Sequence, residues 1–138
     1  MAKTPVKFNA NGIKEREVMM VTYSYNQATD KEGQVTGIPR GGKITIRVKA
    51  LNTGDSDLWQ WMIDQDEHKT GSVDFMDAKT NISQIMKSIR FEDAYCVEYR
   101  EFWGDKVGDG DNAHYEEFVL SCRIIENSKG GRSENEWA

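Results

Sequence analysis

Strict alternation of apolar and polar residues is the feature that most constrains the fold of this chain. In the segment Lys43–Ala50, every second residue is apolar: Ile44, Ile46, Val48 and Ala50. Successive side chains of a β-strand point to opposite faces, so the pattern predicts a strand with one face in the core and the other in solvent or at a polar interface. Nineteen Ile and Val stand against only three Leu, a bias typical of β-proteins.

Short strands are predicted along most of the chain. The dipeptide Asn11-Gly12 favours a tight hairpin turn, because both residues tolerate positive φ. Besides the segment above, the expected strands are Val6–Asn9, Glu15–Gln27, Ser72–Asp77, Ile82–Asp93, Ala94–Trp103 and His114–Glu126. In the last of these, alternation places Phe118, Leu120, Cys122 and Ile124 on one face.

One segment, Asp55–Gln65, has the spacing of a helix. Its pattern of i, i+3, i+4 and i+7 is formed by Leu58, Trp61, Met62 and Gln65. Asp55 stands where an N-cap side chain would accept a backbone N–H. Leu58 and Met62 are expected to pack on the strands. Trp59 and Trp61 point about 200° apart on a helix, so one of them is expected to face a partner.

Six or seven antiparallel strands with one short flanking α-helix favour a mainly β fold, a small antiparallel β-barrel. No internal repeat or linker divides the 138 residues, so we expect a single domain over residues 1–138. The strand Glu15–Gln27 has apolar residues on both faces, and both faces are therefore expected to be covered.

Charge and composition indicate in which cellular compartment the chain is expected to fold. Its net charge is −5, and the longest uncharged stretch, Val18–Thr29, is shorter than the roughly 20 apolar residues of a membrane helix. The first residues, MAKTPVKF, lack the apolar segment of a signal peptide. We therefore expect no membrane insertion, folding in the cytoplasm, and reduced thiols at Cys96 and Cys122.

The segment Ala28–Gly42 is predicted to be a long loop, because its glycines and Pro39 follow no periodicity. Loops of this length without secondary structure are usually functional or disordered. Glycine makes such a loop costly to order unless a neighbouring molecule holds it, so we expect it to act in assembly. The C-terminal residues 127–138 are polar apart from Trp137.

No motif for metal binding or catalysis is complete. The expected hairpin loop Gly104–Asn112 contains three aspartates and a glycine that superficially suggest a calcium loop: Asp105, Asp109, Gly110 and Asp111. They lack the alternating ligands and closing glutamate of a calcium loop, which favours a solvated turn. His68 and His114 have no Cys or His at ligand spacing and are expected at the surface. Without a nucleophile motif, phosphate loop or dinucleotide fingerprint, no enzyme and no cofactor or metal is expected.

A row of basic residues is the main charged feature. Lys43, Arg47 and Lys49 share one face of their strand, and Arg40 comes just before it. Such a row could bind phosphates if the fold gathered it into a groove. It could equally be a solvated strand face, or pair with acidic residues of a neighbouring subunit. The net negative charge argues against a dedicated nucleic-acid-binding protein.

Five short sequence pieces together resemble a known family. They are Val21–Gln27 (VTYSYNQ), Pro39–Gly42 (PRGG), Asp57–Met62 (DLWQWM), Phe91–Val97 (FEDAYCV) and Glu134–Trp137 (ENEW). In their order and spacing, over residues 6 to 137, the chain resembles the tube protein of type VI secretion systems, Hcp or TssD, in the form found in Bacteroidetes.

The resemblance implies a structural protein. It would form hexameric rings that stack as the inner tube of a contractile, phage-tail-like machine, leaving the cell through that machine without a signal peptide. The implied partners are the VgrG spike protein, the contractile sheath and effector proteins. The residues expected at a subunit or ring interface are Pro39, Arg40, Gly41, Gly42, Lys43, Arg47 and Trp59. The alternatives are a free-standing β-barrel that binds a ligand or nucleic acid, and an enzyme whose active site the sequence does not reveal.

Overall fold

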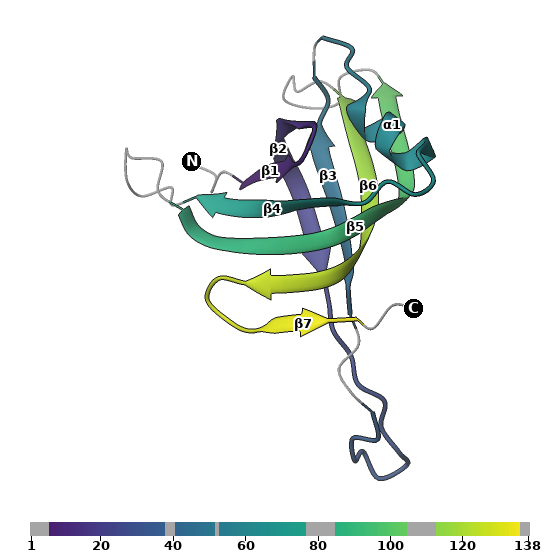
Figure 1. Ribbon diagram of the computed structural model, residues 1–138, viewed down its shortest axis with the longest axis vertical. Coiled ribbons are helices and arrows are strands. Elements are labelled where there is room, and N and C mark those ends of the chain that lie inside the picture. Colours follow the sequence, from purple (N-terminus) through teal and green to yellow (C-terminus); the bar gives the residue numbers. More distant parts are fainter. Residues whose placement is uncertain (1–5, 38–40, 52, 77–84, 105–112, 136–138) are drawn as a thin grey trace.

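The computed structural model describes residues 6–37, 41–51, 53–76, 85–104 and 113–135, which form seven strands and one helix (Figure 1). In chain order these are β1 (Val6–Ala10), β2 (Ile13–Tyr23), β3 (Lys43–Lys49), α1 (Asp57–Ile63), β4 (Lys69–Met76), β5 (Ile85–Gly104), β6 (Ala113–Asn127) and β7 (Arg132–Glu134). The sheet order is β3-β2-β1-β4-β5-β6-β7, with every pair antiparallel. A further pairing of β3 with β6 closes the first six strands into a barrel. The mainly β fold, the barrel and the short helix predicted from the sequence are confirmed.

Aromatic rings occupy the centre of the barrel. Phe8 of β1 is stacked with Phe91 of β5, with ring centroids 5.9 Å apart, and meets Phe118 of β6 edge-on at 5.2 Å. Around them, the alternate residues of β3 are fully buried, as the sequence predicted: Ile44, Ile46 and Val48. Burying each of these side chains stabilises the fold by about 1.5–3 kcal/mol. Side chains thus fill the barrel interior.

Strand β5 runs unbroken through the point where two strands, Ile82–Asp93 and Ala94–Trp103, were expected, so that prediction was wrong. Asp93 has a φ of 52°, in the left-handed region that Asp tolerates better than most residues. The core positions change phase there, because Phe91 and Ala94 are both buried with two residues between them. The unusual backbone conformation of Asp93 therefore lets the inward-facing positions shift by one residue while the strand continues. In the sequence, the same shift in the apolar pattern resembles the end of a strand.

Strand β6 changes phase opposite Asp93. Phe118, Leu120 and Cys122 line the core as expected, but the next residue of the central cluster is Ile125. Ile124 is buried outside that cluster, and it is paired with Glu134 of β7. The two strands thus shift their inward faces together, which keeps their register constant across Asp93; their register shift lies further along, between Cys96 and Glu98.

Helix α1 begins at Asp57, and its N-cap residue is Ser56, which makes no side-chain cap hydrogen bond. The predicted N-cap role of Asp55 was therefore wrong. The Asp55 carboxylate instead accepts hydrogen bonds from Lys14 Nζ and Thr53 Oγ1, both at 2.5 Å. Leu58 is fully buried, Met62 packs against the core, and Trp61 is 2% exposed whereas Trp59 is 52% exposed. The prediction that one of the two tryptophans points outward is confirmed.

The remaining differences lie at element ends. Strand β2 ends at Tyr23 rather than at Gln27, and β7 forms within the segment predicted to be a polar tail. Cys96 and Cys122 are free and buried, as expected for small strand residues. Within the described ranges, no helix is both long enough and apolar enough to cross a membrane.

Candidate assembly surface

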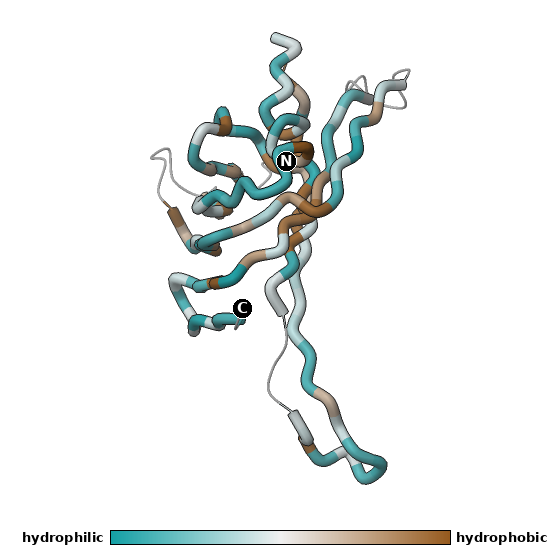
Figure 2. The backbone as a smooth tube through the Cα atoms, turned by 45° about the vertical axis from the view of Figure 1, so that its right-hand side comes forward, coloured by the Kyte–Doolittle hydropathy of each residue, from teal (hydrophilic) through white to brown (hydrophobic). Residues whose placement is uncertain are grey.

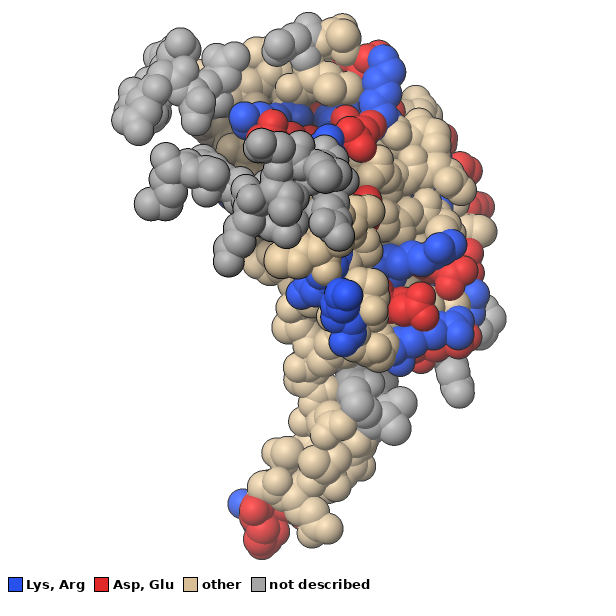
Figure 3. Space-filling model, turned by 90° about the vertical axis from the view of Figure 1, so that its left-hand side faces the viewer, with Lys and Arg blue, Asp and Glu red and all other residues tan. Residues whose placement is uncertain are grey.

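The chain between β2 and β3 projects from the barrel as an arm, which we define as residues 24–37 (Figure 1). All of these residues are exposed. Figure 2 shows that most of the arm is hydrophilic or neutral, whereas the larger hydrophobic stretches lie in the barrel. Its charged residues, Asp30, Lys31 and Glu32, gather at its tip (Figure 3). The long loop predicted from the sequence is therefore present, and it reaches away from the core.

The arm is held in shape by its own hydrogen bonds. Asp30 Oδ1 accepts from the backbone N–H groups of Glu32 at 3.0 Å and Gln34 at 2.9 Å. The Thr36 N–H donates to Ala28 O at 2.8 Å, and the Asp30 N–H donates to Gln34 O at 2.9 Å. An Asp side chain that bonds the backbone two residues on is a common way of fixing a turn. The tip is therefore a small preformed hairpin rather than an open loop.

Two predicted interface residues, Gly41 and Gly42, lie where the arm returns to the barrel, whereas Pro39 and Arg40 lie outside the described residues. Gly42 has a φ of 109°, which disfavours any residue with a side chain. Its carbonyl accepts the Cys122 N–H at 2.6 Å. At Gly41, a Cβ atom would overlap the ring of Tyr25. Both glycines are therefore required by close contacts at the base of the arm.

The basic face of β3 is largely neutralised within the subunit. Arg47 forms hydrogen bonds to Glu117 Oε1 at 2.8 and 3.0 Å and lies over the Tyr115 ring. Its guanidinium is the main cause of the lowered pKa of the Glu117 carboxyl. Lys49 Nζ lies 3.6 Å from Glu17. Lys43 is exposed, and no ion pair of its ammonium is found within the described part of the chain.

A buried ionic network joins α1 to the barrel, and the sequence analysis missed it. The Arg16 side chain of β2 is fully buried. Its Nη1 donates to Glu116 Oε1 at 2.5 Å, and its Nη2 pairs with Asp57 at the start of α1. The Tyr99 hydroxyl donates to Glu116 Oε2 at 2.6 Å. Burial, and then the Glu116 carboxylate, raise the pKa of Tyr99 well above its ordinary value.

Several large apolar side chains remain on the outside of the barrel and arm. The most exposed of them are Met19, Tyr25, Val35, Trp59, Ile63, Ile85, Met86, Phe102 and Trp103. Trp59 meets Tyr99 edge-on, with ring centroids 6.1 Å apart, so its position on α1 is fixed. Single exposed apolar residues are ordinary, so these side chains mark an interface only where they lie next to one another.

Comparison with protein families gives a match over residues 3–138 to the family described as hemolysin coregulated protein Hcp (TssD). The chain belongs to the Hcp (TssD) family. Among solved structures, Hcp1 from Flavobacterium johnsoniae is 33% identical and superposes with a TM-score of 0.81, covering 95% of this chain and 99% of that one. A search of curated proteins gave no match.

Two more distant structures share the fold of this Hcp protein. Hcp1 from the E. coli EAEC 042 pathovar is 12% identical, with a TM-score of 0.71 and coverage of 98% of this chain and 100% of that one. A chain of the anti-feeding prophage baseplate is 11% identical, with a TM-score of 0.51 and coverage of 92% and 93%. The family assignment, with the 33% identical Hcp1, identifies a tube subunit of a type VI secretion system.

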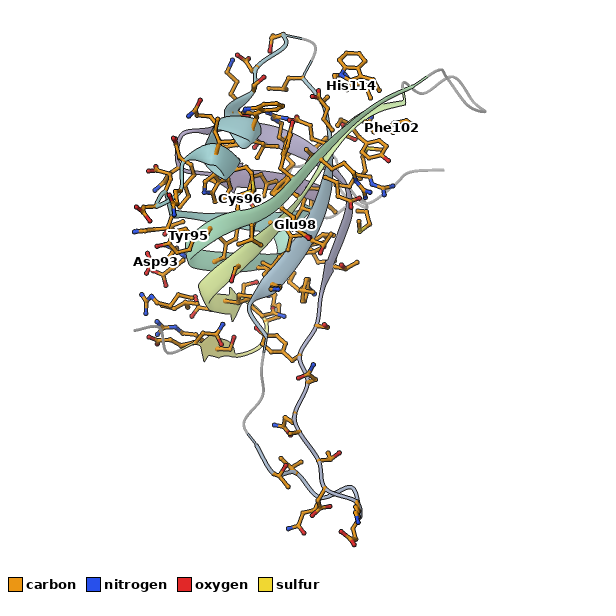
Figure 4. All side chains as sticks on the ribbon, turned by 90° about the vertical axis from the view of Figure 1, so that its right-hand side faces the viewer. Asp93, Tyr95, Cys96, Glu98, Phe102 and His114 are labelled. Carbon is orange, nitrogen blue, oxygen red and sulfur yellow. The ribbon has the colours of Figure 1, made fainter. Side chains whose placement is uncertain are left out.

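The residues considered for metal binding are not brought together in this Hcp protein. The candidate calcium residues lie outside the described ranges, and no cluster of three His, Cys, Asp or Glu that could hold a metal occurs within them. His68 is exposed as expected. His114, also expected at the surface, is partly buried, with 12% of its side chain exposed. It lies near the end of the β5–β6 pair (Figure 4), opposite Trp103, whose ring is stacked on it, and it bonds Glu101 at 2.8 Å.

Proposed function

We propose that this Hcp subunit closes into hexameric rings and that its arm contacts the next ring, so that the rings stack into the inner tube through which effectors travel. The observation that carries the proposal is the arm itself. It is exposed along its whole described length, yet the Asp30 hydrogen bonds hold it in one shape. Ordering an exposed segment costs about 1–2 kcal/mol per residue in backbone entropy. A contact with a neighbouring subunit would offset that cost.

The interface we propose combines the base of the arm with the outer side of α1. Gly41, Gly42 and Lys43 lie at the base of the arm, and Trp59 stands 52% exposed on the helix. Lys43 carries the charge on the β3 face that is left for a partner, since Arg47 is already bonded to Glu117. Arg47 would therefore contribute mainly by holding Glu117 in place. Pro39 and Arg40 belong to the same proposed surface by their position in the sequence.

The proposal includes a structural rather than catalytic role. Burial raises the pKa of both Cys96 and Cys122 to about 12. Since the thiolate is the reactive form, neither cysteine is suited to act as a nucleophile at neutral pH. The pairing of Arg47 and Lys49 with carboxylates likewise supports protein partners over nucleic acid. We propose the VgrG spike, the sheath and effectors as those partners, with export through the type VI apparatus without a signal peptide.

A deletion tests the role of the arm. Replacing residues 29–35 by Gly-Gly removes the preformed tip and leaves Tyr25 and Gly41 in place. We expect this variant to run as a hexamer in sedimentation but to form no stacked tubes in electron microscopy at concentrations where the parent protein does. The matched control is Lys31→Ser, which changes the charge of the tip and leaves its hydrogen bonds. Tubes of normal length from the deletion variant would refute the proposed contact.

A further inference from the structure

The two ends of the arm are both held by residues near the C-terminus, Ser133 in β7 and Asn135 just after that strand. The Tyr25 hydroxyl, on the outgoing end, lies 2.7 Å from Ser133 Oγ. Gly41, on the returning end, accepts a hydrogen bond through its carbonyl from Asn135 Nδ2 at 3.1 Å. In Figure 1, β7 runs toward the point where β2 and β3 leave the barrel. Ser133 and Asn135 are two residues apart and so lie on the same side of an extended chain.

Asn135 is built tightly into this position. Its Nδ2 donates a second hydrogen bond to Cys122 O at 3.2 Å, and its backbone N–H donates to Arg123 O at 2.7 Å. A Cβ atom added at Gly42 would overlap Asn135 Nδ2 and come within 2.9 Å of Cys122 O. The approach of Asn135 to the base of the arm therefore requires glycine at position 42.

Among the described residues, no such attachment to the barrel is found for the tip of the arm. From Ala28 to Thr36, the backbone hydrogen bonds that the structure shows join arm residues to one another. These bonds fix the shape of the tip but not its direction relative to the barrel. Strand β7, in contrast, is fastened to the barrel, because Glu134 pairs with Arg123 at 2.8 Å and Arg123 pairs with Asp93 at 2.7 Å.

We propose that Ser133 and Asn135 are positioning residues that set the direction of the arm. The assignment rests on the proposed role of the arm in stacking. Tyr25, Gly41 and Asn135 come from three distant sequence pieces, Val21–Gln27, Pro39–Gly42 and Glu134–Trp137, and they meet in one cluster. We call the contacts of Ser133 with Tyr25 and of Asn135 with Gly41 the clamp. Without the clamp, the arm keeps its hairpin but samples many directions, so that stacking must first select one of them.

Hydrogen exchange in isolated rings tests the clamp without requiring tubes. The Cys122 N–H, bonded to Gly42 O at 2.6 Å, reports on the base of the arm, and the Thr36 N–H reports on its tip. In Asn135→Ala we expect the Cys122 amide to exchange about tenfold faster, the loss expected for a hydrogen bond or two. The Thr36 amide should keep its parent rate. Unchanged exchange at Cys122, or an equal rise at both amides, would overturn the assignment.

Assembly provides the second readout. We expect Asn135→Ala rings to need about tenfold more protein than the parent for half-maximal tube formation, in proportion to the fraction of arms correctly directed. Tyr25→Phe removes only the hydroxyl that meets Ser133, and it should raise this concentration by a smaller factor in the same direction. The control is Arg132→Ala, an exposed change on β7 whose ion pair is with Glu134. It should match the parent in both measurements.

The outcomes separate the clamp from the stacking proposal. If Asn135→Ala fails to fold, Tyr25→Phe decides the question, because it leaves every backbone contact in place. Parent-like tube formation by both variants would overturn the proposed role of the clamp. The role of the arm in stacking would still be tested separately by the arm deletion. If the arm deletion stacks normally, the stacking role falls, and the clamp still stands or falls on the exchange rates of the Cys122 and Thr36 amides.

Discussion

The buried Arg16–Glu116 pair gives a prediction about the free energy of unfolding of variants that lack one or both of its charges. The two side chains are 0% and 3% exposed, and Arg16 Nη1 lies 2.5 Å from Glu116 Oε1. Two unit charges about 4 Å apart attract each other by about 4 kcal/mol at an effective dielectric constant of 20. Removing both charges from water costs a similar amount, so a buried pair is close to neutral compared with two apolar side chains.

Each single substitution is therefore expected to cost more than the double one. Arg16→Met leaves Glu116 buried without its cation, and Glu116→Leu leaves Arg16 with only Asp57. We expect each to lower the free energy of unfolding by about 3–5 kcal/mol, as for other buried pairs with one partner removed. The double variant should lose less than either, since only the Tyr99 hydroxyl and Asp57 then lack a partner that they have in the parent.

Urea denaturation at one fixed protein concentration measures these differences, because unfolding of a ring-forming protein depends on concentration. The matched control is the pair Lys7–Glu15, whose side chains are 44% and 54% exposed. Removing it should change the unfolding free energy by less than about 1 kcal/mol. Single substitutions at Arg16 and Glu116 whose costs simply add in the double variant would refute the reasoning, because the two side chains would then act independently.

Three further predictions concern the helix, the basic face and pH. Leu58→Ala should lower the melting temperature strongly, at a cost of about 2–5 kcal/mol, whereas Trp59→Ala should leave it nearly unchanged and weaken ring formation measured by sedimentation; equal thermal losses would contradict this. Lys43→Glu should weaken assembly in a salt-dependent way without changing the free energy of unfolding. Arg47→Glu should weaken assembly and also lower the free energy of unfolding, because it removes a cation from a carboxylate; parent-like stability of Arg47→Glu would be the contrary result. The pKa of Tyr99 is raised in the folded state, so the neutral hydroxyl contributes stability that is fully present below the ordinary pKa of 10.0 and is lost as the pH rises from that value toward the raised pKa. Tyr99→Phe should therefore flatten the fall in stability at alkaline pH, and an unchanged alkaline profile would contradict this.

Regular elements were predictable where side chains follow one simple period. Strand β3 alternates without interruption, and its apolar residues are the ones that the barrel buries. The opposite orientations of Trp59 and Trp61 follow from helix geometry alone. Both predictions need only local spacing, so no knowledge of the partner strands was required.

Predictions failed where contacts distant in the sequence decide the local structure. The phase change at Asp93 signals a strand end, yet β6 shifts with it and the strand continues. Arg16 stands in the run Lys14–Glu17, whose alternating charges are typical of a solvated face. Only the closed barrel brings Glu116, a hundred residues away in the chain, against it. The three residues of β7 have no apolar pattern, and the strand forms because the end of β6 offers it an edge.

The parts of this subunit that we propose to face neighbours are fastened to the barrel by polar contacts as well as by apolar packing. Helix α1 is joined through Arg16, and the base of the arm through Asn135 and Tyr25. Apolar packing tolerates rearrangement when volume and pattern are kept, whereas hydrogen bonds weaken steeply when their angles deviate. Hydrogen bonds and ion pairs therefore fix the direction in which an attached segment points more sharply than apolar packing of the same strength. In a tube of repeated rings, any error in that direction would recur at every contact, so a sharply defined direction is what the proposed stacking role requires of the arm.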